Sequence, residues 1–148
     1  MSSNIYVEAQ MLIRKPVEDV FQAFINPEVT TNFWFTKSTG KLEEGKKVTW
    51  EWEMYGVKSD VQVHTIIPNQ LIKTEWGDPA VQVDYEFKEM EKGTLVVIKS
   101  YGFTETGEDL LKLINDNTGG FTTVLDGCKA YLEHGINLRL IEDKFPQK

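Results

Sequence analysis

The stretch from Gly119 to Leu140 places the strongest constraint on what this chain can fold into. When successive residues are set about 100° apart, as in an α-helix, apolar residues fall on one side and polar residues on the other. Asn115-Asp116-Asn117-Thr118, just before the stretch, is typical of a helix start, and Pro146 prevents extension beyond its end. The predicted apolar stripe comprises Phe121, Val124, Leu125, Cys128, Tyr131, Leu132, Gly135, Ile136 and Leu138. A helix with so wide an apolar face needs a second apolar surface to pack against.

That second surface is predicted by the alternation of apolar and polar residues upstream. From Ile5 to Arg14 the two kinds alternate, which is typical of a strand with one buried face. Further strands are expected within residues 48–53, 60–67, 71–76, 81–88 and 94–103, and the short connections between them indicate an antiparallel sheet. The side chains expected on the buried face are Val48, Trp50, Trp52, Val61, Val63, Thr65, Ile67, Ile72, Thr74, Trp76, Val81, Val83, Tyr85, Phe87, Val96, Ile98 and Ser100.

Three shorter helical segments are also expected. Pro16 at a first helical position predicts a helix that ends at Asn26-Pro27. Pro27 then starts a second, short helix that carries the aromatic trio Phe33-Trp34-Phe35. Because three consecutive side chains cannot all face one way, part of the trio is expected at a surface or beside a gap. A brief helix over residues 107–114 is predicted to lead into the long one.

This order of elements, together with particular residues, carries a resemblance to a known family. The residues concerned are Pro16-Val17-Glu18-Asp19-Val20-Phe21, Trp34-Phe35, Gly56, Ile67-Pro68, Leu71 to Trp76, Leu125, and Cys128-Lys129-Ala130-Tyr131-Leu132-Glu133-His134-Gly135. On these residues, and over essentially its whole length, the chain resembles the START-like (SRPBCC) superfamily. Within that superfamily it is similar to the family related to the C-terminal domain of the Hsp90 ATPase activator.

The resemblance implies a single START-like domain over residues 1–148 with an α+β, helix-grip fold. In such a fold a curved antiparallel sheet of six or seven strands wraps a long C-terminal helix, and two short helices follow the first strand. It also implies a cavity between the sheet and the long helix, under the short helices. The matching residues concern packing and turns, so they favour an architecture rather than an activity.

Composition narrows the classes of partner and compartment. The 148 residues carry a formal charge of −7, which argues against binding to nucleic acid or to an anionic membrane surface. A single cysteine cannot form an intrachain disulfide, the N-terminus does not read as a signal peptide, and no apolar run is long enough to span a bilayer. A cytoplasmic protein is therefore expected.

The predicted inner face supplies a candidate ligand site rather than a catalytic one. Each of its aromatic residues could simply fill a core, but several indole and phenol groups converging on one space also suit an apolar pocket with a few polar groups. The residues predicted to line it are Trp34, Trp50, Trp52, Val63, Trp76, Tyr85, Ser100, Phe121, Leu125 and Cys128.

No set of residues predicts catalysis, a metal site or a cofactor. Cys128 on an apolar face is typical of a buried, inert thiol, since a nucleophile would need a base beside it. His64 is expected on the outer face of the sheet and His134 on the polar side of the helix, with no partner at metal-ligand spacing. Glu51, Glu53, Asp84 and Glu86 are interpreted as solvated strand faces.

The preferred hypothesis is a non-enzymatic binding module that holds a small, largely apolar molecule between the sheet and the C-terminal helix. A second hypothesis, implied by the resemblance, is an interaction protein that assists an Hsp90-type chaperone ATPase. A third is an enzyme of the cyclase or hydrolase kind, which the absence of an inward acid–base pair disfavours. The expected partner is thus a small apolar ligand or a chaperone, and the oligomeric state is left open.

Overall fold

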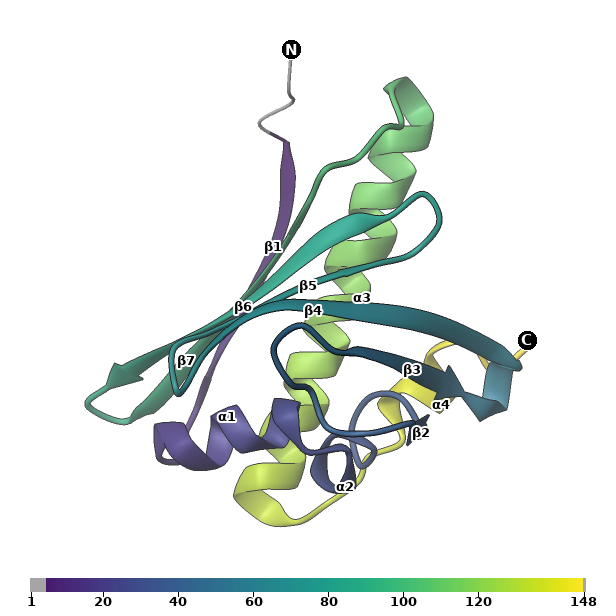
Figure 1. Cartoon of the computed structure of the whole chain (residues 1–148). Coiled ribbons are helices and arrows are strands. Elements are labelled where there is room, and N and C mark those ends of the chain that lie inside the picture. Colours follow the sequence, from purple (N-terminus) through teal and green to yellow (C-terminus); the bar gives the residue numbers. More distant parts are fainter. Residues whose placement is uncertain (1–4, 148) are drawn as a thin grey trace.

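A computed structural model describes residues 5–147, and the part of the signal-peptide prediction that concerns residues 1–4 lies outside this range. Its centre is a seven-stranded antiparallel sheet in the order β1-β7-β6-β5-β4-β3-β2 (Figure 1). Successive strands from β2 to β7 pair with one another, and β1 adds to the outer edge of β7. The strands are β1 (Tyr6–Ile13), β2 (Lys37–Ser38), β3 (Lys47–Trp52), β4 (Val57–Ile67), β5 (Leu71–Trp76), β6 (Val81–Met90) and β7 (Gly93–Tyr101).

The helices lie at one end and on one face of this sheet. α1 (Val17–Ile25) and α2 (Pro27–Thr30) connect β1 to β2, and the short 3-10 turn η1 (Glu53–Tyr55) connects β3 to β4. α3 (Gly107–His134) runs along the sheet, which bends around it, and α4 (Leu140–Lys144) follows (Figure 1). The predicted α+β helix-grip architecture is confirmed. Within residues 5–147, no helix combines the length and apolar character needed to cross a bilayer.

The inner faces of the sheet, α1 and α3 share one hydrophobic core. The alternation predicted for most strands is confirmed, because the residues assigned inward are those that become buried. Representative fully buried side chains are Val7, Val48, Ile72, Val83, Ile98 and Leu125.

β4 departs from the predicted alternation at a bulge. Its register with β5 shifts between Val63 and Thr65. Before the shift Val63 is fully buried as predicted, but beyond it Ile66 packs against the core and Ile67 is 41% exposed. The prediction of Ile67 as an inward residue is therefore wrong, because one extra residue in a strand exchanges its two faces.

α3 begins at Gly107, well before the predicted start at Gly119. The polar cluster over 115–118 lies within the helix, where the Thr118 hydroxyl donates to the Ile114 carbonyl (2.6 Å) and the Asn117 amide to the Leu113 carbonyl (2.8 Å). These side chains bond to the preceding turn of their own helix instead of capping a new one. The predicted separate helix over 107–114 is thus the first part of a continuous α3.

α3 also ends earlier than the predicted Leu140. Gly135 adopts a left-handed conformation (φ 68°), and its N–H bonds to the Ala130 and Tyr131 carbonyls, which closes the last turn. Glycine takes this conformation without the steric cost of a Cβ, so it ends the helix rather than joining its apolar face. Ile136 and Leu138, predicted on that face, are each 50% exposed.

The aromatic trio Phe33-Trp34-Phe35 lies after α2 and not within it, because α2 ends at Thr30. All three side chains are buried, since they enter the core from a turn and not from one helical face. The two-residue strand β2 that follows was not predicted; it pairs Ser38 with Trp50.

Candidate functional site

A pocket of about 600 Å³ opens between the sheet and α3, but its lining includes residues of α4 and none of the short helices α1 and α2, under which the cavity was expected. We call it the aromatic pocket. Trp52 and Trp76 stand at the ends of β3 and β5, Phe121 projects from α3, and Ile141 and Phe145 come from α4 and the residue after it. Its remaining walls come from the start of β4, where Val57 and Lys58 are exposed, and from α3 between Asp116 and Val124.

The inner wall of the aromatic pocket is a cluster of mutually packed rings. The Trp34 ring centroid lies 4.9 Å from that of Trp50 and 6.2 Å from that of Trp76. Trp52 stacks on Trp76 with a centroid separation of 6.4 Å and an interplanar angle of 25°. Phe121 meets Trp76 edge to face. The cluster continues without a gap from the core to the pocket surface.

The structure divides the ten predicted site residues into two groups. Trp34, Trp52, Trp76 and Phe121 line the aromatic pocket. The other six are at most 1% exposed and do not line it: Trp50, Val63, Tyr85, Ser100, Leu125 and Cys128. Five of these six belong to the hydrophobic core, and the sixth, Ser100, is equally buried. Alternation identifies an inward side chain, but it does not say how far the two layers stand apart at that position.

The C-terminal segment supplies a wall that the sequence did not predict. The Tyr55 hydroxyl donates to the carbonyl of Ile141 and to that of Glu142 (3.1 Å), and the Tyr55 ring contacts that of Phe145. Tyr55 thus holds α4 against the pocket opening. Tyr55 follows β3 in η1, and α4 is only five residues long, so neither belongs to a periodic pattern that would have identified it.

Two buried polar atoms in this region form no well-aligned hydrogen bond among the described residues. They are Nε1 of Trp76, whose ring lines the pocket, and the hydroxyl of Tyr85, which lies in the core behind it. Burial raises the pKa of the Tyr85 phenol, and the nearby Thr74 and Trp76 side chains offset part of that rise. Burial likewise raises the pKa of the Cys128 thiol, so both groups are neutral near pH 7. Neither the Tyr85 phenol nor the Cys128 thiol, both buried behind the pocket wall, is therefore a ready nucleophile.

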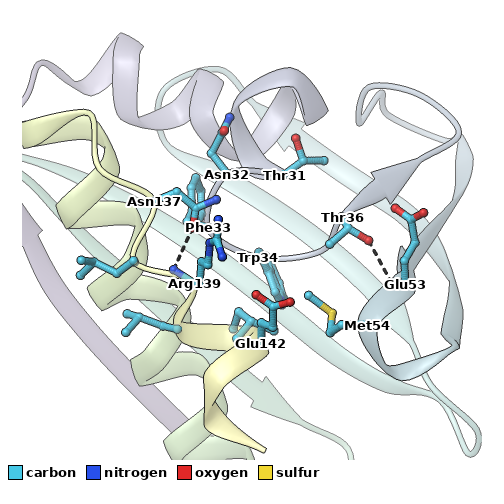
Figure 2. Close-up of a pocket in the computed structure, with 14 residues that line it drawn as sticks. Thr31, Asn32, Phe33, Trp34, Thr36, Glu53, Met54, Asn137, Arg139 and Glu142 are labelled. Atoms are coloured by element: carbon cyan, nitrogen blue, oxygen red, sulfur yellow. Dashed lines mark hydrogen bonds between the residues drawn. The ribbon is translucent and has the colours of Figure 1, made fainter. Parts of the chain in front are cut away.

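A second pocket, of about 500 Å³, lies on the other side of α4, and we call it the polar pocket (Figure 2). Trp34 and Ile141 line both pockets. Gly127 forms part of the floor, where a Cβ would come within 3.3 Å of the Phe33 carbonyl oxygen. A glycine in α3 therefore lets the segment after α2 pack closely and shape this pocket.

The outer face of the sheet holds a partly buried polar cluster that the alternation of residues did not indicate. Asp84, predicted to be solvated, is only 8% exposed, and its Oδ2 accepts from Lys73 (3.0 Å) and from the Tyr101 hydroxyl (3.0 Å). The hydrogen bond to Asp84 raises the pKa of Lys73, while burial raises that of Tyr101. The prediction failed because cross-strand neighbours cover Asp84 on a face assumed to be open.

The histidines lie as predicted, on exposed surfaces. His64 Nε2 is 2.8 Å from Oε1 of Glu75 on the neighbouring strand, and this contact lowers the pKa of Glu75. The His134 side chain is 69% exposed at the end of α3. Across residues 5–147, no three His, Cys, Asp or Glu side chains are arranged to hold a metal ion.

Comparison with known proteins gives a consistent family and fold. The family model described as Activator of Hsp90 ATPase homolog 1-like protein matches residues 14–133. A crystal structure of a protein from Staphylococcus saprophyticus is 31% identical and superimposes with a TM-score of 0.83, covering 91% of this chain and 96% of that one. A comparison with curated proteins finds no match.

Two more distant structures share the fold. A crystal structure from Mesorhizobium loti is 18% identical with a TM-score of 0.77, covering 89% of this chain and 99% of that one. The solution structure of the Aha1 dimer from Colwellia psychrerythraea is 17% identical with a TM-score of 0.75, covering 88% and 98%.

Proposed function

Because this chain belongs to the family of Activator of Hsp90 ATPase homolog 1-like proteins, within the START-like superfamily, we propose that it is a non-enzymatic binding module. Its ligand is a small, largely apolar molecule held in the aromatic pocket. The observation that carries the proposal is the cavity of about 600 Å³ between the sheet and α3, walled by tryptophan and phenylalanine rings. Ligand sites typically have volumes of about 300–1,000 Å³ and apolar, aromatic walls.

The indole N–H of Trp76 supports the same function. Trp76 presents a ring to the pocket while its indole N–H forms no well-aligned hydrogen bond among the described residues. A buried donor left without a partner costs about 1–3 kcal/mol. A ligand that accepts a hydrogen bond and displaces the Trp76 ring slightly would recover part of that cost.

The packing of Trp50 and Trp52 indicates which of the two tryptophans can contact a ligand. Trp50 is 1% exposed and touches Trp34, Phe35 and Trp76, so it belongs to the core. Trp52 is half-buried and lines the pocket. The two tryptophans share one strand face, yet only Trp52 is expected to contact a ligand. They therefore form a matched pair for an experiment.

The experiment titrates N-phenylnaphthylamine, a neutral apolar dye that fluoresces in apolar surroundings, into the wild type and into two variants. We expect the wild type to bind the dye. Trp52→Leu should change the dye affinity several-fold and cost about 1–2 kcal/mol of folding free energy, because it enlarges an existing space. Trp50→Leu should cost about 3 kcal/mol or more, because it empties a packed site, with a smaller effect on dye affinity. Absence of dye binding in all three proteins would mean that these rings only fill a core.

A second candidate function rests on the family description, which refers to activation of the Hsp90 ATPase. An interaction protein of this kind would associate with an Hsp90-type chaperone and stimulate ATP hydrolysis. A pull-down with the chaperone from the same cell, together with an ATPase assay, tests it. Neither association nor stimulation would remove this candidate while leaving the pocket proposal intact.

A further inference from the structure

The polar pocket contains one positively charged and two negatively charged side chains, and the positive one does not pair with either negative one. Arg139, Glu53 and Glu142 all line it. All three side chains are exposed, and among the described residues none of them forms an ion pair within 4.0 Å. Figure 2 shows Arg139 toward one end of the pocket and Glu53 at the other, with Glu142 between them. A space thus separates complementary charges.

The backbone holds Arg139 in a costly conformation at this place. Its φ of 57° and ψ of 34° lie in the left-handed region, which a non-glycine residue seldom occupies. The conformation is supported by the Arg139 N–H, which donates to Oδ1 of Asn137 (2.9 Å). The same bond orients the Asn137 amide, whose Nδ2 donates to no other group within residues 5–147. Arg139 and Asn137 therefore form one donor group.

The other polar side chains of the pocket bond within the protein. Thr31 Oγ1 donates to the Pro27 carbonyl (2.7 Å), and Asn32 Nδ2 donates to the Glu28 carbonyl (2.9 Å). Thr36 Oγ1 donates to the Glu51 carbonyl and accepts from the Glu53 N–H, each at 3.0 Å. The donors available to a ligand are thus those of Arg139 and Asn137, and the available carboxylates are those of Glu53 and Glu142.

Apolar surface lies between these charged groups. Phe33, Trp34, Met54 and Leu138 line the same pocket, and Figure 2 shows Trp34 and Met54 between Arg139 and Glu53. A guanidinium with an adjacent amide suits a carboxylate, a glutamate suits an ammonium group, and an indole suits an apolar or aromatic side chain.

We propose that the polar pocket is a second binding site, separate from the aromatic pocket, for a small zwitterion with an apolar side chain. Its chemical class is a free amino acid or a very short peptide. Arg139 and Asn137 bind the carboxylate, Glu142 or Glu53 binds the ammonium group, and Trp34 and Met54 contact the side chain.

Calorimetric titration with three related probes tests the site. Phenylalanine carries both charges, phenylpropionate only the carboxylate, and phenethylamine only the ammonium group. We expect phenylalanine to bind more tightly than either single-charge probe. Glycyl-phenylalanine, in which the two charges lie further apart, identifies whether the amino acid or the peptide fits better.

Two variants and a control assign the roles. Arg139→Gln should weaken binding of phenylalanine about tenfold or more and leave phenethylamine binding unchanged. The double variant Glu53→Gln/Glu142→Gln should weaken the binding of phenylalanine and phenethylamine, which carry an ammonium group. It should leave the binding of phenylpropionate unchanged. Arg14→Gln removes the other arginine, which does not line the pocket, and should change nothing.

Equal binding of the three probes, or no binding of either zwitterion to the folded wild type, would overturn the proposal. An equal loss in Arg139→Gln and Arg14→Gln would also overturn it, because the effect would then be one of net charge. A thermal melt of each variant separates loss of binding from loss of folding. Dye binding in the aromatic pocket is an independent measurement, so failure of one site leaves the other testable.

Discussion

Tyr85 combines nearly complete burial with a hydroxyl that forms no well-aligned hydrogen bond among the described residues. Its ring is useful to the core, since it packs against Phe24 and Trp34. Its hydroxyl contributes less to stability, because it forms no well-aligned hydrogen bond and the nearby Thr74 and Trp76 side chains offset only part of the effect of its burial. Thr74, on the neighbouring strand, differs in this respect: it is equally buried, but its hydroxyl donates to the Val83 carbonyl (2.9 Å).

Because only the Thr74 hydroxyl forms a well-aligned hydrogen bond, we expect the removal of the Tyr85 hydroxyl and of the Thr74 hydroxyl to affect stability differently. Tyr85→Phe should leave the free energy of unfolding unchanged or raise it by up to about 1 kcal/mol, because an unsatisfied group is removed. Thr74→Val should lower it by about 1–2 kcal/mol, because the Val83 carbonyl loses its donor. Urea denaturation measures both. A loss of more than about 1 kcal/mol in Tyr85→Phe would show that the hydroxyl has a partner, such as a buried water.

At the scale of elements, the end of α3 is tied to the end of β1 through Glu133. Its carboxylate accepts from the Arg14 N–H (2.8 Å) and from Lys129 Nζ (2.6 Å), and Lys129 also donates to the Leu12 carbonyl (2.9 Å). Burial of Glu133 by itself would raise its pKa, but these donors outweigh burial and hold the pKa below the ordinary value of 4.5. The ionised form is thus stabilised by folding.

The stability contributed by Glu133 should therefore depend on pH. A carboxylate whose pKa is lowered in the folded state adds stability above its unfolded pKa of about 4.5, and this stability is lost as the pH falls. Glu133→Gln should cost about 1–2 kcal/mol at pH 7, and the difference from the wild type should shrink in acid below that pKa. Asp126→Asn, at an exposed position of the same helix, is the control and should cost little at either pH. If Glu133→Gln lowered the free energy of unfolding equally at pH 7 and in acid below pH 4.5, the charge of Glu133 would not be involved.

At the scale of the whole molecule, the sheet depends on α3 to cover its inner face. Phe121, Val124, Leu125 and Cys128 are each at most 5% exposed, and they face strand residues that are equally buried. Burying a large apolar side chain contributes about 1.5–3 kcal/mol, while a whole domain is stable by only about 5–15 kcal/mol. The helix therefore contributes a large share of the net stability.

Removal of residues 121–148 should abolish cooperative folding, because it exposes the inner face of the sheet as well as losing the helix. Calorimetry should then show no thermal transition, and the chain should aggregate. A chain ending at Gly135 keeps α3 and its terminating glycine but lacks α4, and it should retain a cooperative transition at a lower temperature. Cooperative unfolding of the chain that lacks residues 121–148 would mean that this part of α3 is peripheral to the fold.

Every strand except β2, most of the inward residues and the existence of a long amphipathic helix could be predicted from the amino-acid sequence. Period-two and helical spacing record which face of each element is apolar, and that face must be buried in any compact fold. For the same reason Val48, Ile72 and Ile98 were assigned correctly without a structure.

Contacts between residues distant in the sequence set the ends of these elements, the break in β4 and the spacing between the sheet and α3. The bulge after Val63, the continuation of α3 through 115–118 and the burial of Asp84 all depend on neighbours that are distant in the sequence. The same holds for the pockets. Trp50 and Trp52 have the same alternation, but Trp52 lies where α3 and the sheet stand apart and α4 closes over the gap. The distance between two packed layers is a property of the assembled fold, and no local spacing of residues encodes it.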